Sequence, residues 1–262
     1  MNRCYFVVEG PHEIEVIGHL LRRRGLHRVR LLDDLDEQFQ ALVPTTYPVD
    51  GDILRRVATP TFFQNESHCV AIDSAIGVER LCTTFQVRRT RVTELHGVGI
   101  LADADQNAAG RRQEIVSGLP ELDFGSEAGG VYGDTPRAGI YVLPDNENPG
   151  SLEDLLLRCA EVVYPTLLKG ARDFVSPLDA KNRSVFVDRK ESEDLGKPFG
   201  KDKAIIACVA NVLRPGKAIQ VSIQDNRWFK DDRVFQEPLL KNLEAFVDAV
   251  LGLNPTADSS HA

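Results

Sequence analysis

Short apolar runs alternate with segments of helical periodicity through the first 150 residues of the chain. We expect the runs to be buried strands, because a short apolar run bounded by turn residues is typical of a strand covered on both faces. These runs lie at residues 4–8, 68–72, 98–102 and 140–143, and residues 28–32 could form a further strand. Apolar residues at helical spacing predict intervening helices at residues 13–24, 78–87 and 111–117. This alternation predicts an α/β fold with a mostly parallel sheet flanked by helices.

The pattern becomes helical from residue 151 onward. We expect four helices in this part, at residues 152–163, 164–174, 204–213 and 238–251. Residues 181–203 are densely charged and predict a solvated connector. The whole is expected to be a single domain over residues 1–252, with its core at 1–150, a helical C-terminal part at 151–252 and a flexible tail at 253–262.

Two polar stretches interrupt the first half of the chain. Residues 33–66 contain prolines and have no clear periodicity, so they could be an insertion over one edge of the sheet. Residues 121–136 are rich in glycine and acidic residues, which favours a loop or a weak hairpin.

Acidic residues follow two of the predicted strands directly. Glu9 ends the first run, and Asp103 and Asp105 end the run at 98–102. The carboxyl ends of parallel strands meet at one edge of a sheet, where such folds place ligands. Three carboxylates there would form a cluster of the kind that holds Mg²⁺ and supports phosphoryl chemistry. On an extended segment Asp103 and Asp105 would face the same side, although aspartates here could also form a turn or a helix N-cap.

Three further acids are candidate ligands of the same site. Asp145 follows the strand at 140–143, and it is the strongest of the three. Glu13 and Glu153 each fall in the first turn of a predicted helix, where a carboxylate can also be explained by the helix dipole. Ser151 is a suitable N-cap for the helix that contains Glu153.

Two basic side chains could serve this chemistry. Lys203 follows a glycine-containing segment and could neutralise a phosphate, or it could be an ordinary solvated lysine. His12 lies close to Glu9 in the sequence, although a surface histidine is the simpler interpretation. The glycines before Lys201 do not form a Walker A loop, and the sequence has neither a GxSxG nor an HExxH motif.

Charge and cysteine content narrow the function classes. The chain has a net charge of −8, which disfavours a module that binds nucleic acid by broad neutralisation of its backbone. Its five cysteines are spaced singly, as in reduced cytosolic proteins. The apolar run at the N-terminus is too short for a signal peptide, and no run is long enough for a membrane span. We therefore expect a cytoplasmic protein without a membrane partner.

The segments 7–10 (VVEG) and 101–105 (LADAD) resemble the Toprim domain of topoisomerases, bacterial primases, ribosomal-RNA maturases and the overcoming-lysogenization-defect nucleases. The string at 144–153 (PDNENPGSLE), with the lysines at 201 and 203, is similar to a small prokaryotic Toprim-like family. The resemblance implies a Toprim-like fold in which Glu9, Asp103 and Asp105 bind Mg²⁺ or Mn²⁺. It also allows Glu9 to act as general acid or base, and Lys203 could stabilise the transition state.

The resulting hypothesis is a metal-dependent phosphodiesterase, a nuclease that acts on DNA or RNA. One alternative is a non-catalytic regulatory or interaction subunit with a weak metal site, in a defence (for example phage defence) or genome-maintenance assembly. Another is a hydrolase of a small phosphate or nucleotide, which suits the acidic composition better than long DNA does. A protein partner that supplies other activities, and a homo-oligomer, are compatible with each of these readings.

Overall fold

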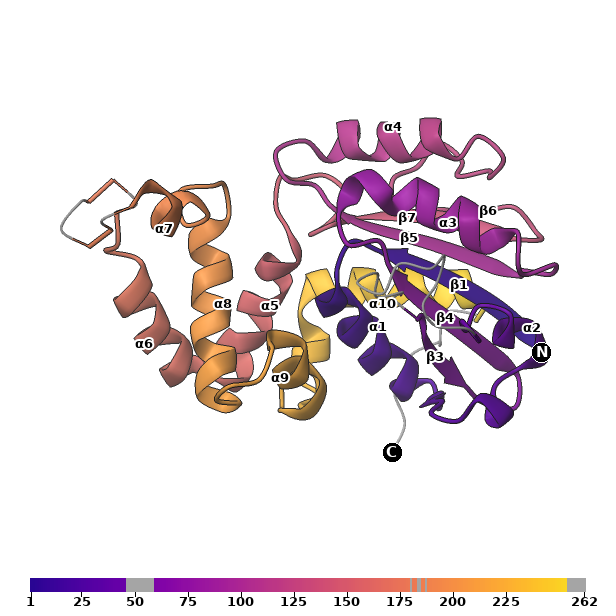
Figure 1. Cartoon of the computed structure of the whole chain (residues 1–262), viewed down its shortest axis with the longest axis horizontal. Coiled ribbons are helices and arrows are strands. Elements are labelled where there is room, and N and C mark those ends of the chain that lie inside the picture. Colours follow the sequence, from indigo (N-terminus) through magenta and orange to yellow (C-terminus); the bar gives the residue numbers. More distant parts are fainter. Residues whose placement is uncertain (46–58, 180, 183–184, 187, 254–262) are drawn as a thin grey trace.

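A seven-stranded, mostly parallel sheet organises the first half of the molecule (Figure 1). The structure is a computed structural model, and it describes residues 1–45, 59–179, 181–182, 185–186 and 188–253. The strand order is β2-β3-β4-β1-β5-β7-β6. The strands are β1 (Asn2–Val8), β2 (His27–Arg28), β3 (Thr61–Gln64), β4 (His68–Ser74), β5 (Gly97–Asp103), β6 (Val131–Tyr132) and β7 (Arg137–Leu143).

The four long strands at the centre of the sheet are parallel, and β1 lies between β4 and β5. The register pairs Val8 with Leu101, and Asp103 with Leu143. The carboxyl ends of β1, β5 and β7 therefore meet at the same edge. The shorter strands β2, β3 and β6 pair antiparallel at the two sides of the sheet. The predicted α/β class with a mostly parallel sheet is confirmed.

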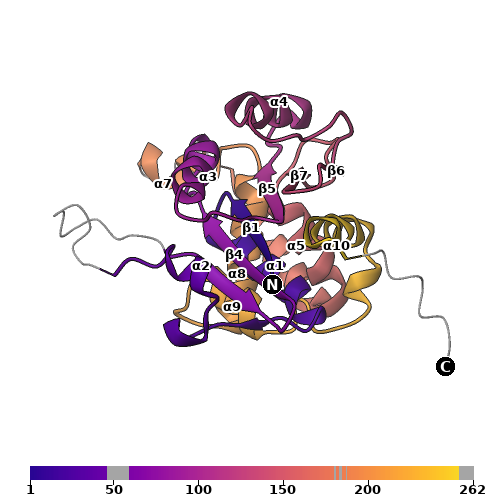
Figure 2. The same cartoon turned by 90° about the vertical axis from the view of Figure 1, so that its right-hand side faces the viewer.

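Helices cover both faces of the sheet (Figures 1 and 2). The helices α3 (Leu81–Arg89) and α4 (Ala108–Gly118) lie on one face, and α1 (Pro11–Arg23) and α10 (Pro238–Leu251) lie on the other. Along β1 the side chains alternate between two hydrophobic cores, because successive residues of a strand point to opposite faces. Phe6 belongs to the core beneath α1 and α10, and Val7 to the core beneath α3.

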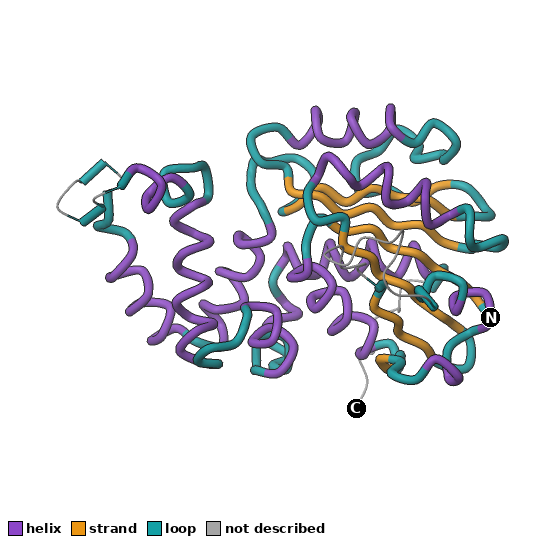
Figure 3. The backbone as a smooth tube through the Cα atoms, in the orientation of Figure 1, coloured by secondary structure: helices purple, strands orange, loops and turns teal. Residues whose placement is uncertain are grey.

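The second half of the chain forms a helical part beside the carboxyl ends of the strands (Figure 3). Its helices are α5 (Leu152–Val163), α6 (Pro165–Val175), α7 (Arg189–Glu193), α8 (Gly200–Leu213) and α9 (Ile219–Asp225). One of the two hydrophobic cores continues from the sheet through α5 into these helices. The chain then returns along the sheet in α10. At Gly97 a side-chain Cβ would lie 2.2 Å from the carbonyl oxygen of Val250, so only glycine allows α10 to pack this closely.

Most of the predicted elements are present, and the helices at 152–163 and 238–251 have the predicted bounds. The solvated connector predicted at 181–203 is wrong in part, because α7 and the first turn of α8 lie within it. The strand proposed at 28–32 is reduced to β2, and a 3-10 helix follows at Leu32–Asp34.

The stretch at 33–66, which has no clear periodicity in the sequence, contains α2 (Glu37–Gln40) and β3. Its residues 46–58 lie outside the described part of the chain. The weak hairpin at 121–136 is represented by β6, which pairs with β7. The tail expected at 253–262 lies, from residue 254, beyond the described residues. All five cysteines are free thiols. Among the described residues, none of the helices is long and apolar enough to cross a membrane.

Candidate metal centre

Four acidic side chains gather where β1 and β5 end and where α1 and α5 begin. Glu9 follows β1 and Asp103 is the last residue of β5, while Glu13 and Glu153 lie in the first turns of the two helices. The parallel register places the strand ends side by side. The helix α1 begins three residues after the end of β1, and α5 begins nine residues after the end of β7, the neighbour of β5. The topology of the sheet thus brings together acids that are up to 144 residues apart in sequence.

Backbone amides hold three of these carboxylates in place. Glu9 Oε2 accepts a hydrogen bond from the Asp103 amide at 3.3 Å, which links the ends of β1 and β5. Asp103 Oδ1 accepts from the Leu152 amide at 2.9 Å, at the start of α5. Glu13 Oε2 accepts from the Gly10 amide at 3.2 Å. The helix-dipole explanation of Glu13 is therefore realised, and the same side chain also belongs to the cluster.

Burial and the repulsion of neighbouring acids make ionisation of Asp103, Glu13 and Glu9 unfavourable. Asp103 and Glu13 are each only 6% exposed. Burial raises the pKa of Asp103 well above its usual range, and the charges of Glu13, Glu9 and Glu153 raise it further. Burial raises the pKa of Glu13 to about 7, and Glu9 and Glu153 add to that increase. Burial also raises the pKa of Glu9, to which Asp105 contributes. These shifts indicate a site that is short of positive charge.

Glu153 carries a buried oxygen with no bonding partner. The residue is 7% exposed, and its Oε2 accepts no hydrogen bond from any residue that the structure describes. The helix-dipole explanation offered for Glu153 leaves this oxygen without a partner. The hydrogen bond at the start of α5 is made by its neighbour, since Asp154 Oδ2 accepts from the Ser151 amide at 2.8 Å. Glu153 is thus left with an unsatisfied carboxylate beside three other acids, which is costly unless a cation or a proton compensates it.

Asp105 lies at the rim of the cluster, where Arg111 holds it. Its side chain is 53% exposed and accepts from Arg111 Nη2 at 3.0 Å. Arg111 Nε also donates to the Asp103 carbonyl oxygen at 3.1 Å. The backbone of Asp105 has a φ of 48° and forms a bridge with Gly150. The two aspartates therefore do not share one extended segment, contrary to the sequence-based expectation.

Two basic groups, His12 on α1 and Lys203 on α8, lie near enough to the acids to influence their charges or to be influenced by them. Lys203, in the first turn of α8, lowers the pKa of Glu9 and of His12 through its charge. Burial lowers the pKa of His12, while Glu153 opposes that change. The three helices α1, α5 and α8 therefore converge on this site, and the sequence candidates Lys203 and His12 both lie within electrostatic reach of the cluster.

Asp145 has a different setting. Its oxygens accept from the amides of Glu147 and Asn148, at 3.1 and 2.8 Å, and from the Asn148 side chain at 2.8 Å. Partial burial works against ionisation, but these hydrogen bonds outweigh it and lower the pKa of Asp145. The described residues include no hydrogen bond between Asp145 and the other acids. The side chain shapes the loop between β7 and α5, and the structure does not draw it into the cluster.

The carboxylates as they stand are bonded to the protein rather than directed at a common point. Within the part of the chain that the structure describes, no three His, Cys, Asp or Glu side chains are arranged to hold a metal ion. Asp103 and Glu13 each have one carboxylate oxygen that accepts a hydrogen bond from a backbone amide. Side-chain rotation would have to redirect oxygens from this cluster for a cation to bind. The Oε2 of Glu153 has no hydrogen-bond partner among the described residues, so it could bind a cation without first losing a hydrogen bond.

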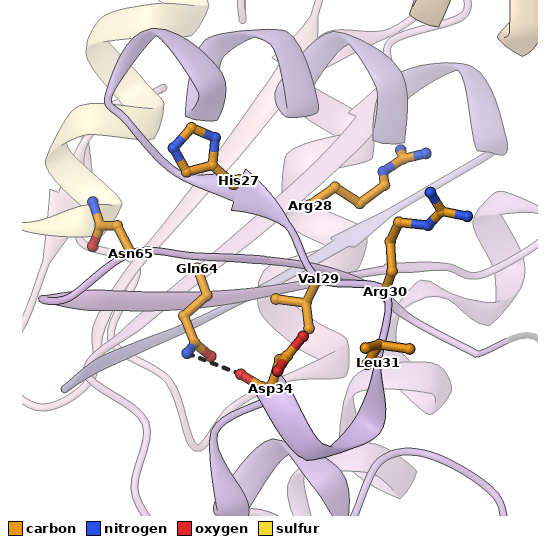
Figure 4. Close-up of a pocket in the computed structure, with 8 residues that line it drawn as sticks. All are labelled: His27, Arg28, Val29, Arg30, Leu31, Asp34, Gln64 and Asn65. Atoms are coloured by element: carbon orange, nitrogen blue, oxygen red, sulfur yellow. Dashed lines mark hydrogen bonds between the residues drawn. The ribbon is translucent and has the colours of Figure 1, made fainter.

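A cavity of about 680 Å³ lies elsewhere, against β2 and β3 (Figure 4). It is lined by residues 27–31, 34, 64 and 65. The Nη2 of Arg28 in its wall donates to Glu15 on α1 at 2.7 and 2.8 Å, and Gln64 donates to the Asp34 carbonyl oxygen at 3.2 Å. These polar groups are engaged with the protein itself. The acid cluster, on the other hand, combines buried charge with an unsatisfied oxygen, so it is the stronger candidate for a functional site.

Sequence reasoning missed Arg111, and it did not distinguish the role of Asp154 from that of Glu153. Arg111 lies six residues after Asp105 in α4, and that proximity to the acidic segment was the available signal. Asp154 was hidden by its neighbour, because both acids fall in the first helical turn and only the hydrogen bonds distinguish them.

Comparison with known proteins identifies a family and a similar fold. Residues 5–249 match the family described as "Protein of unknown function (DUF3226)". The crystal structure of the hypothetical protein PH0156 from Pyrococcus horikoshii OT3 is similar, with a TM-score of 0.55 and 18% sequence identity. The alignment covers 94% of this chain and 99% of that one. No curated protein matches the sequence. At this identity the structural similarity bears on the fold alone.

Proposed function

The chain belongs to the DUF3226 family of proteins of unknown function, and from its site we propose that it is a Mg²⁺- or Mn²⁺-dependent phosphodiesterase that acts on nucleic acid. The observation that carries the proposal is the crowding of Glu9, Glu13, Asp103 and Glu153 at the carboxyl edge of a parallel sheet. Ligand sites of open α/β sheets occupy this position. The resemblance of residues 7–10 and 101–105 to the Toprim domain supports the same conclusion.

The residues present fit a hard divalent cation. Carboxylate oxygens are the ligands that Mg²⁺ and Mn²⁺ prefer, and a cation would relieve the repulsion that raises the pKa values of Asp103 and Glu13. It would also provide the missing partner of Glu153 Oε2. We assign Glu9, Asp103 and Asp105 as the principal ligands, with Glu13 and Glu153 as additional ones. Asp145 is not included, because its oxygens are committed to its loop.

The cation would supply two things when bound, neutralisation of charge on the phosphate oxygens and activation of a water molecule for attack. The side chains of the protein would bind the phosphate and orient the ligands of the cation. Lys203, in the first turn of α8, lies within electrostatic reach of Glu9, and there it could neutralise a phosphate oxygen in the transition state. Arg111 holds Asp105 and the Asp103 carbonyl oxygen, so it positions both aspartates. Glu9 could instead act as general acid or base, in place of binding the cation, because its pKa is raised in the metal-free protein.

A small phosphate ester or nucleotide is the second candidate substrate. Asp202, beside Lys203, lies close enough to Asp154 and Glu153 for their charges to raise its pKa, in addition to burial. The surroundings of the site are thus acidic, as is the chain as a whole with its net charge of −8. A short substrate with one or two phosphates meets less repulsion in such surroundings than a long polyanion does.

The test is hydrolysis of single-stranded DNA, double-stranded DNA, RNA and nucleotides with Mg²⁺, with Mn²⁺ and with a chelator. The proposal predicts metal-dependent cleavage of a polymer that is lost in Asp103→Asn/Asp105→Asn. The matched control is Asp33→Asn/Asp34→Asn, which removes two exposed charges at the far side of the sheet and should retain activity. Hydrolysis of nucleotides alone would replace the nuclease by the second candidate. A folded protein that hydrolyses none of these substrates would refute both and favour a regulatory subunit.

A further inference from the structure

An exposed apolar groove runs between α6 and α8, in the helical part of the molecule. Its volume is about 560 Å³, and its walls include Leu167, Gly170 and Phe174 from α6 with Cys208 and Val212 from α8. Phe174 and Val212 are 65% and 63% exposed, which places them among the most exposed large apolar side chains of the described residues. Exposed apolar side chains that gather around a recess are typical of an interaction surface.

The composition of α8 also indicates that its outer side is covered. From residue 204 to residue 213 the only polar residue is Asn211, so apolar side chains occur all round the helix. Ile205, Ile206 and Val209 are buried against the rest of the protein, whereas Val212 faces outward. A helix that is apolar on all sides is ordinarily buried on all sides. The described residues of the chain bury only one side of α8.

Gly170 is an independent indication that another molecule covers the groove. It occupies the middle of α6 (Pro165–Val175), where glycine destabilises a helix relative to alanine. A Cβ at this position would meet no atom of the described residues within 4 Å, so nothing in the described part of the chain requires glycine there. An approaching surface from another molecule would require it, because the missing side chain leaves a recess in the groove.

We propose that this groove is the interface between two copies of the chain. Phe174 and Gly170 are four residues apart on α6, so they lie on one face of the helix, one turn from each other. If the α6 helices of two copies cross antiparallel between these positions, each Phe174 ring lies over Gly170 of the other copy. The projecting ring of Phe174 and the recess at Gly170 then belong to the same surface of each copy, as a twofold interface requires.

The charges beside the groove favour the same arrangement. Lys169 and Asp173 are also one turn apart on α6, are exposed and form an ion pair within the chain. Antiparallel crossing brings Lys169 of each copy toward Asp173 of the other copy. The opposite charges at the edge of the interface then attract each other. With α8 alongside, the two copies would pack as four helices. Val212 and Lys203 are nine residues apart on α8, about 13 Å along its axis, so the Val212 end of the contact is separate from the candidate metal centre.

Sedimentation velocity and light scattering over a wide range of concentration test this proposal. The intact chain should form a species of twice the 29.0 kDa mass of one chain. Val212→Glu should raise the dimer dissociation constant by at least about tenfold, because it places an unpaired charge in the groove. Gly170→Gln should raise it similarly by filling the recess. That variant should keep its fold, and its melting temperature should be no lower, since the new side chain meets open space among the described residues and glutamine favours a helix more than glycine does.

The control is Val87→Glu, which introduces the same charge at a valine that is 53% exposed on α3. The dimer of this variant should be unchanged. A chain that is monomeric at every concentration would overturn the proposal and leave the groove to a partner of another kind. A dimer with the same dissociation constant in Gly170→Gln and Val212→Glu would overturn it equally, because the interface would then lie elsewhere.

Discussion

Replacing Glu13 by glutamine is expected to stabilise the metal-free protein above neutral pH. Folding buries this carboxyl beside Glu9 and Glu153, and its pKa rises from an ordinary 4.5 to about 7. Between these two values the folded state binds more protons than the unfolded state does, so stability falls as pH rises. Below about pH 4.5 both states are protonated and the group has no effect.

The size of the effect follows from the two pKa values. At about 1.4 kcal/mol per pH unit, a rise from 4.5 to about 7 corresponds to a loss of about 3 kcal/mol at pH 8. Glutamine has nearly the same shape and keeps an oxygen that can accept from the Gly10 amide, a bond of 3.2 Å in the wild type. The variant should therefore regain most of this free energy at about pH 8 and almost none at about pH 4.

Urea unfolding in the presence of a chelator, at both pH values, measures the difference. Glu15→Gln is the control, because Glu15 lies on the same helix and is also 6% exposed. Glu15 accepts two hydrogen bonds from Arg28, at 2.7 and 2.8 Å, so its neutralisation should destabilise the protein at about pH 8. If Glu13→Gln failed to stabilise the protein at the higher pH, the inference of a charge-strained cluster would be wrong.

Three further predictions concern the fold around the site. Gly97→Ala should destabilise the protein by about 1–3 kcal/mol or more in urea unfolding, because its Cβ would lie 2.2 Å from the Val250 carbonyl oxygen; an unchanged midpoint would contradict the packing of α10. Asp73→Ala should lower the free energy of unfolding by about 3–5 kcal/mol, because it removes the buried carboxylate 2.8 Å from Arg88 Nε; a loss below about 1 kcal/mol would mean that this pair contributes little. Trp228 is the only tryptophan, and its ring is fully buried, so its fluorescence should be blue-shifted in the folded protein and move to longer wavelength on unfolding. Emission typical of a solvated indole before unfolding would contradict that burial.

The sheet could be predicted because its central strands are covered on both faces. Such strands must be apolar throughout, and the runs at 4–8, 68–72, 98–102 and 140–143 are visible without any knowledge of the neighbours. The helix at 238–251 had clear boundaries, since Pro238 opens it and Gly252 follows it with a φ of 71°. In contrast α7 consists of charged and polar residues only. It carries no apolar periodicity, and its start depends on a cap from Asp188.

The site was predictable as a set of residues but not as a geometry. Glu9, Asp103 and Glu13 could be found because each lies at a junction of a strand or a helix, where the topology of a parallel sheet brings side chains together. The conformation of Asp105 could not be found, because it depends on a bridge to Gly150, which lies 45 residues further along the chain. The different settings of Asp145 and Glu153 were equally hidden, since they are decided by individual hydrogen bonds.

Equilibrium binding of Mn²⁺ to the metal-free protein tests the central claim most directly. Calorimetry should show binding by the wild type that becomes tighter as pH rises, because carboxyl groups with raised pKa values must lose protons to bind a cation. Asp103→Asn should abolish that binding, although asparagine can still accept from the Leu152 amide and keep the fold. Wild-type protein that binds no Mn²⁺, or binding that is unchanged in Asp103→Asn, would contradict the assignment of this cluster as a metal centre.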